Sequence, residues 1–255
     1  MSWRLFRSSS FLSQVAEASH YEAWKWLLRQ FGGLADLSLS PLVRPTRAFF
    51  PPTEATGHAR AEHVFECVKR HARVAEWPCR VVAQPRGPEL RVGELLTLEL
   101  ARGHAAGTFG YDRNEVVITY DPANLDDPLK LVATFAHEVA HYRLSRLAEA
   151  PPGGPEAHET TTDLTTVYLG FGLFGANCAF NFGQHQGVMS HGWSWSRLGY
   201  LGERDWVFAL AVFLALRGES PAELRPFLKD HLFADLGKAM AWLKRNPTAI
   251  AALSA

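Results

Sequence analysis

The chain contains few cysteines, and their spacing excludes the common cysteine-based sites. Three occur among 255 residues, at Cys67, Cys79 and Cys178, and none belongs to a CxxC pair. A disulfide-rich secreted scaffold or a thiolate zinc site needs more cysteines at closer spacing. We therefore expect free thiols in a reducing compartment, with a Cys67–Cys79 disulfide as the less favoured alternative.

An excess of charge of either sign is also missing. The chain carries 26 basic and 26 acidic residues, so its formal net charge is +0. A protein that binds a polyanion normally shows a dense basic cluster, and no Lys/Arg cluster here has that density. We therefore expect no nucleic-acid partner.

No apolar run is long enough to cross a membrane. Residues 164–196 contain no Asp, Glu, Lys or Arg. The most apolar part, 167–180, would span only about 21 Å as a helix, against about 30 Å for a bilayer core. It is therefore predicted to be a buried helix. The N-terminus has Arg4 and Arg7 but no apolar stretch of signal-peptide length, so we expect a cytoplasmic protein without a membrane partner.

The composition is that of a globular domain, with 47% hydrophobic and 20% charged residues. A chain of this length forms one large domain or a domain with a helical extension. The patterns predict an N-terminal helix and Pro-rich strap over 1–57, a core over 58–180, and a loop with a helical subdomain over 181–255. We expect these parts to form one continuous domain.

The most informative motif is His137-Glu138-Val139-Ala140-His141. Histidines four residues apart on a helix project from one face, about 40° apart around the axis, so they can bind the same metal ion. Zinc prefers neutral nitrogen ligands, and a carboxylate next to the first histidine can take a proton from a zinc-bound water molecule. Glu138 has the position of that general base.

The surrounding sequence predicts that this motif lies in the middle of a helix. Asp127 can be the N-cap and Pro128 the first helical residue. Apolar residues then recur at helical spacing up to Leu147, and the Pro/Gly-rich segment 151–155 ends the helix. The alternative is that two ordinary histidines occur on one helix without a metal.

A third ligand is expected from the next predicted helix. Catalytic zinc sites usually have three protein ligands and keep one position for water. Glu159 can be the third ligand, and Asp163 can accept the other ring N–H of a ligand histidine and fix its tautomer. Alternatively, Asp163 binds the metal directly with Glu159 accessory, or Glu156 or His158 reaches the site if the helix starts earlier.

HExxH followed by ExxxD resembles the gluzincin branch of the zincin metallopeptidases. The resemblance covers roughly residues 60–180 and is specific at five positions. It implies zinc ligands at His137, His141 and Glu159, with Glu138 as general base and Asp163 as the partner of a ligand. Several zincin families have Ala before that Asp, where this chain has Thr162.

Zincins commonly use a His, Tyr or Arg to stabilise the oxyanion, and His191 and Tyr200 are the candidates here. By analogy, an edge strand at 107–111 would pair with a peptide or protein substrate.

The predicted fold is α+β and zincin-like. A small, mainly antiparallel sheet would pack on the HExxH helix, with an N-terminal helix and a helical C-terminal half. The patterns predict strands at 79–84, 95–101, 107–111 and 116–120. Further helices are predicted over 14–32, 59–76, 159–180, Asp205 to about Arg217, 221–232 and 234–246. Between them we expect a Pro-rich irregular strap over 34–57, which packs Phe49 and Phe50 on the core, and a loop over 181–204.

The function predicted from these features is that of a zinc-dependent, metallopeptidase-like hydrolase that uses a zinc-bound water activated by Glu138. Two alternatives remain. The fold could serve as a non-enzymatic sensor or interaction module, or the metal could be structural and tie the two helices together.

Overall fold

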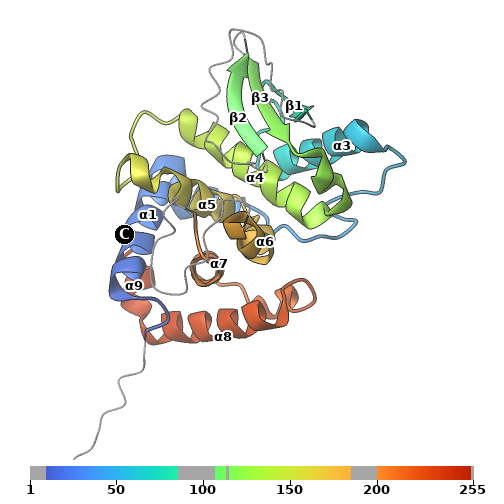
Figure 1. Ribbon diagram of the computed structural model, residues 1–255. Helices are drawn as coiled ribbons and strands as arrows, with labels where there is room; N and C mark the ends of the chain where they lie inside the picture. The colour runs from blue at the N-terminus through green and yellow to red at the C-terminus, as the bar shows by residue number, and fades with distance from the viewer. Residues whose placement is uncertain (1–9, 86–106, 113–114, 185–199, 254–255) are drawn as a thin grey trace, which may run out of the picture.

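The computed structural model describes residues 10–85, 107–112, 115–184 and 200–253. The side chains of 180–184 and of Tyr111 and Asp112 are not described. Figure 1 shows a mainly helical α+β chain with a small sheet. The helices are α1 (Gln14–Phe31), α2 (Gly33–Ser38), α3 (Gly57–His71), α4 (Pro128–Ser145), α5 (His158–Tyr168), α6 (Gly172–Gln184), α7 (Glu203–Arg217), α8 (Asp230–Arg245) and α9 (Pro247–Ala251), and the strands are β1 (Cys79–Ala83), β2 (Gly107–Asp112) and β3 (Glu115–Tyr120).

The sheet is mixed rather than mainly antiparallel. Its described strands have the order β1-β3-β2. β2 and β3 lie at the predicted strands 107–111 and 116–120 and pair antiparallel, whereas β1 pairs with β3 in parallel. A tight turn cannot join two parallel strands, and the chain between β1 and β3 includes the whole of β2. The strand predicted at 95–101 lies between β1 and β2, outside the described residues.

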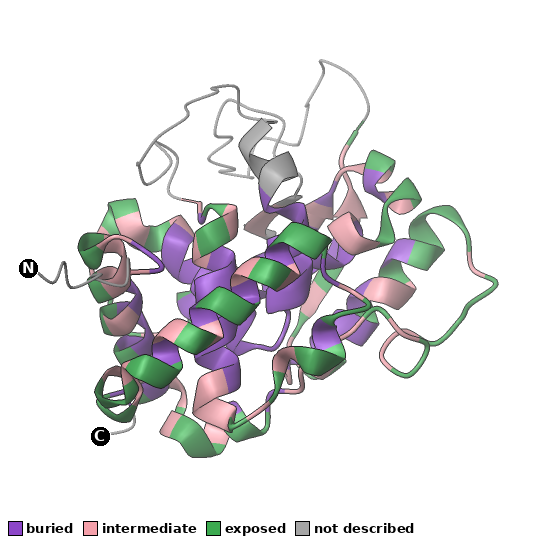
Figure 2. Ribbon diagram, turned by 90° about the horizontal axis from the view of Figure 1, so that it is seen from below, coloured by how far each residue is buried: buried purple, intermediate pink, exposed green. Residues whose placement is uncertain are grey.

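Helix α4 is the centre of the molecule. It contacts β2 and β3 on one side and α5 and α6 on the other, and α7 and α8 follow beyond α6 (Figure 1). Residues 131–140 of α4 are all buried, and in Figure 2 the buried segments lie in the middle of the molecule, with exposed turns outside them. A helix buried on all sides places its polar residues in a dry environment, which strengthens their electrostatic interactions.

The N-terminal part largely follows the prediction. Helix α1 begins after Ser13, whose hydroxyl accepts a hydrogen bond from the backbone N–H of Ala16, and ends at Phe31, before the capping residue Gly32 with φ +100°. The predicted second helix ends at His71, five residues earlier than expected. In the strap, α2 is a short helix that was not predicted, and Phe49 and Phe50 pack against the core as expected.

The predicted helix over 159–180 is wrong, because it is broken into α5 and α6 around Gly170. Gly170 has φ +93°, and a Cβ there would lie 1.8 Å from the backbone oxygen of Pro41. Its own carbonyl accepts a hydrogen bond from Val43 N at 3.0 Å. At Gly175, by contrast, α6 packs closely against Trp206 of α7, and a Cβ there would lie 2.2 Å from the indole ring.

The C-terminal helices also differ from the prediction. The predicted loop starts later, because α6 continues to Gln184. Helix α7 begins at Glu203, two residues before the predicted start at Asp205. Asp205 therefore lies in its first turn, and it pairs with His20 at 3.2 Å. The two helices predicted over 221–232 and 234–246 are instead a short 3-10 turn after Ser220 and the single helix α8.

Two further observations bear on the sequence-based expectations. All three cysteines are free, as predicted. Among the described residues, no helix combines the length and the apolar character needed to cross a membrane. The division into three parts remains a prediction.

Candidate metal centre

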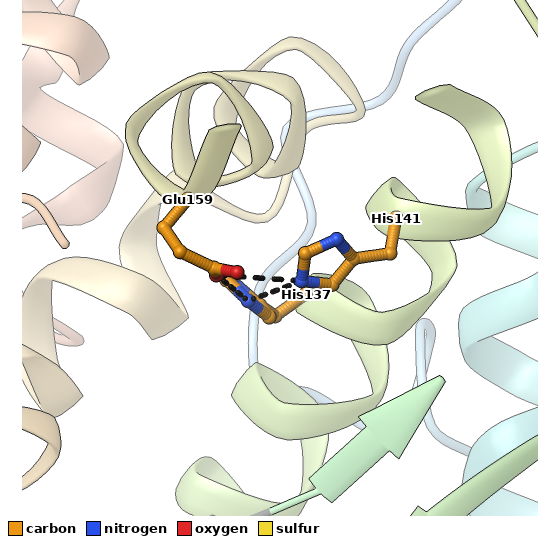
Figure 3. Close-up of side chains that lie close together, drawn as sticks. All are labelled: His137, His141 and Glu159. Atoms are coloured by element: carbon orange, nitrogen blue, oxygen red, sulfur yellow. Dashed lines mark hydrogen bonds and ion pairs between the residues drawn. The ribbon is translucent and has the colours of Figure 1, made fainter. Parts of the chain in front are cut away.

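Helices α4 and α5 bring the two halves of the predicted site together. Asp127 caps α4 by accepting a hydrogen bond from Lys130 N at 3.1 Å, and Pro128 is its first residue. His137 and His141 then lie one turn apart on the face of α4 that meets α5. Glu159 lies in the first turn of α5, where its side chain points between the two imidazole rings (Figure 3).

The three side chains form a compact group that could hold a metal ion. His137 Nε2 lies 3.0 Å from His141 Nε2 and 3.2 Å from Glu159 Oε2, and His141 Nε2 lies 3.4 Å from the same oxygen. Ligands about 2.0–2.1 Å from a tetrahedral zinc ion are separated by about 3.3 Å. The three spacings therefore match those that a single zinc ion requires.

The chemistry of the donor atoms also fits a cation. His137 Nδ1 lies 2.9 Å from Asp163 Oδ1, so a neutral His137 donates its Nδ1–H to Asp163. Its Nε2 lone pair then faces both Glu159 and His141, an arrangement that a cation between the three groups would stabilise. Burial alone would lower the pKa of His137, but the Asp163 and Glu159 carboxylates raise it well above its ordinary value. These carboxylates favour a positive charge here, whether a proton or a metal ion.

Both carboxylate oxygens of Asp163 are engaged by groups other than the expected metal. Oδ1 accepts from His137, and Oδ2 accepts from the backbone N–H of Leu201 at 2.9 Å. The whole Asp163 residue is only 2% exposed to solvent. This geometry favours Asp163 as the group that orients His137, and Glu159 as the direct ligand. Glu156 lies in an exposed 3-10 turn and does not belong to the three-residue group.

Glu138 is buried beside the group. Burial raises the pKa of its carboxyl, and the nearby His141 and His137 partly offset this effect. A general base must accept a proton and later release it, which is easier for a carboxylate whose pKa lies above its ordinary value. The environment of Glu138 therefore suits the role that the motif predicts.

Tyr200 reaches the same site from the segment before α7. Its ring centroid lies 5.7 Å from that of His137. Burial, the charges of Glu159, Glu138 and Asp163, and a hydrogen bond with Glu159 all raise the pKa of its phenol. Tyr200 thus stays protonated as an O–H donor. The other oxyanion candidate, His191, lies outside the described residues, and both roles remain predictions.

The surroundings of His141 were not anticipated from the sequence. His141 Nδ1 lies 3.3 Å from both Thr162 Oγ1 and His158 Nε2. His158 was considered only as an alternative metal ligand, and Thr162 only as a departure from the family pattern. The spacing contained a signal, because Thr162 is one residue before Asp163 and therefore on a neighbouring face of the same helix.

The comparisons with known proteins give no further guide. No family model, no curated protein and no solved structure matches this chain. The site must therefore be interpreted from its own residues.

Proposed function

We propose that this protein is a zinc-dependent hydrolase with His137, His141 and Glu159 as the zinc ligands. The observation that supports this most strongly is the close approach of His137 Nε2, His141 Nε2 and Glu159 Oε2, which all lie within 4.8 Å of one another. Three protein ligands leave one tetrahedral position for water, as catalytic sites require.

When bound, zinc would supply a Lewis acid that polarises a water molecule and the carbonyl group under attack. Glu138 accepts a proton from the attacking water and passes it to the leaving amine as the C–N bond breaks. Asp163 holds His137 in the tautomer whose Nε2 faces the site. Tyr200 donates a hydrogen bond to the carbonyl oxygen as negative charge develops on it.

The proposed substrate is a peptide or protein segment. Strand β2 lies at one edge of the described sheet, and Phe109 of β2 stacks beside His141, with ring centroids 6.4 Å apart. An extended peptide added to that edge would run next to the site, and its backbone would be held without strict sequence preference. This placement favours an amide over a small soluble ester as the substrate.

The test compares Glu138→Gln with the wild type and with Glu62→Gln, a substitution of a glutamate on α3 that pairs with His58 near the protein surface. Each purified protein is loaded with zinc and incubated with a broad peptide library. We expect Glu138→Gln to keep its zinc and lose at least about 100-fold in cleavage rate, whereas Glu62→Gln cleaves like the wild type.

Full activity of Glu138→Gln would refute the mechanism. Tight zinc binding without cleavage by the wild type, together with unfolding on chelation, would indicate the structural zinc site instead.

A further inference from the structure

We propose that Thr162 is a positioning residue for His141, holding its imidazole so that Nε2 faces the metal position. This inference rests on the proposed function, because it concerns a ligand of the same site. It gives the second histidine a partner on α5, just as Asp163 is the partner of the first.

The hydrogen-bond directions around Thr162 support this role. Its hydroxyl donates to the carbonyl oxygen of His158, one turn earlier on α5, at 2.9 Å. Having used its only proton there, Oγ1 can only accept a second hydrogen bond. The atom that faces it is His141 Nδ1 at 3.3 Å, so this contact favours the tautomer of His141 that carries its proton on Nδ1.

A competing interaction makes this partner necessary. Glu159 Oε2 lies 3.4 Å from His141 Nε2, and a carboxylate attracts the imidazole proton to that nitrogen. A proton on Nε2 would block metal binding, because the ligand must offer a lone pair. Thr162 draws the proton to Nδ1 and so opposes Glu159. Its own rotamer is fixed, because the residue is fully buried and bonded within α5.

The chain offers a closely matched control in Thr166. Its hydroxyl donates to the carbonyl oxygen of Thr162 at 3.0 Å, one turn further along α5, and the residue is also buried. Replacing either threonine by the isosteric valine removes the same kind of hydrogen bond from the same helix. Only Thr162 faces a predicted ligand.

The experiment measures the zinc dissociation constant by competition with a chromophoric chelator. We expect Thr162→Val to weaken zinc binding by about 10- to 100-fold, the usual effect of losing the partner of a ligand histidine. Thr162→Ser, which keeps the hydroxyl, should restore binding to within about threefold of the wild type, and Thr166→Val should leave it unchanged. Thr162→Ala provides a smaller replacement if the valine variant does not fold.

A second readout follows the proton directly in the zinc-free protein. Nitrogen-15 chemical shifts report which ring nitrogen of neutral His141 carries the proton, and we expect the Nε2–H fraction to rise in Thr162→Val but not in Thr166→Val. An unchanged tautomer ratio together with unchanged zinc affinity would overturn the proposal. So would a loss of affinity in His158→Ala but not in Thr162→Val, because His158 would then be the partner. If the wild type binds no zinc, the proposed function fails, and the tautomer ratio still decides the role of Thr162.

Discussion

His137 Nδ1 and Asp163 Oδ1 lie 2.9 Å apart, joining α4 to α5 in a buried position. Burying a carboxylate and an imidazole costs free energy unless both are hydrogen-bonded and their charges are compensated. Here Leu201 N–H satisfies the second oxygen of Asp163. The pair therefore fixes the direction of the His137 ring, and the lone pair of Nε2 points to the metal position.

The first prediction separates the direct ligand from the orienting group. We expect about one zinc ion per chain in the wild type and almost none in Glu159→Ala, which leaves two protein ligands. Asp163→Asn should retain zinc with an affinity about 10- to 100-fold lower, because only the partner of His137 changes. Zinc content by atomic absorption and titration checks this. The reverse order of effects would make Asp163 the ligand and Glu159 the accessory residue.

The second prediction concerns Tyr200. If its hydroxyl stabilises the oxyanion, Tyr200→Phe should lower kcat by about 100-fold or more with little change in KM for the same peptide. Zinc affinity should stay near that of the wild type, because the phenol is not a ligand. Steady-state kinetics and a zinc titration on the same preparation distinguish the two. A variant that cleaves normally would assign the oxyanion to another donor, and one that loses zinc would give Tyr200 a structural role through Glu159.

The local parts of the site were predictable from the sequence. The Asp127-Pro128 start and the four-residue spacing of His137 and His141 are set by helix geometry alone, so α4 appears as expected. Glu159 and Asp163 are also four residues apart, so the same geometry predicted that both would lie on one face of the next helix, and both contact His137. The β2–β3 pair was predicted as two strands, 107–111 and 116–120, separated by only a few residues.

The parts that depend on distant contacts were not predictable. The break at Gly170 lies where the strap segment around Pro41 comes close to the chain, and helix periodicity contains no information about that contact. The parallel pairing of β1 with β3 likewise depends on a connection whose path the sequence does not fix. Thr162 faces His141 only because α4 and α5 meet at one particular rotation, which is determined by core packing.

The third prediction concerns the carboxylate of Asp36, which joins three elements. It accepts two hydrogen bonds from Arg73, at 3.0 and 2.7 Å, and one from the Tyr168 hydroxyl at 2.9 Å. Burial alone would raise the pKa of Asp36, but these partners lower it below its ordinary value. Asp36→Asn should therefore lower the free energy of unfolding at neutral pH by about 1–2 kcal/mol.

The sign of the pH dependence follows from the lowered pKa. The stabilisation by Asp36 is fully present above the unfolded carboxyl pKa of about 3.9 and is lost as the pH falls through the lower folded value. Urea titrations of wild type and Asp36→Asn should thus converge in strongly acidic solution. Glu22→Gln, which removes an exposed pair with Lys25, serves as the control and should change stability by less than about 0.5 kcal/mol. A constant difference between wild type and Asp36→Asn at all pH values would contradict this account.

The fourth prediction tests whether the contact with the strap sets the α5–α6 break. Gly170 and Gly218 both have positive φ, +93° and +66°, so an alanine at either position pays a backbone cost of about 1–2 kcal/mol. At Gly218 an added Cβ meets nothing within 4 Å, whereas at Gly170 it would lie 1.8 Å from the Pro41 carbonyl oxygen. Gly170→Ala must therefore displace backbone as well, and we expect a loss of at least about 4 kcal/mol in unfolding free energy.

Because α5 carries Glu159 and Asp163, Gly170→Ala should also weaken zinc binding, while Gly218→Ala should not. Equal losses in the two variants, measured by denaturant unfolding, would mean that the strap yields and that the conformation of Gly170 alone directs α5 toward the site.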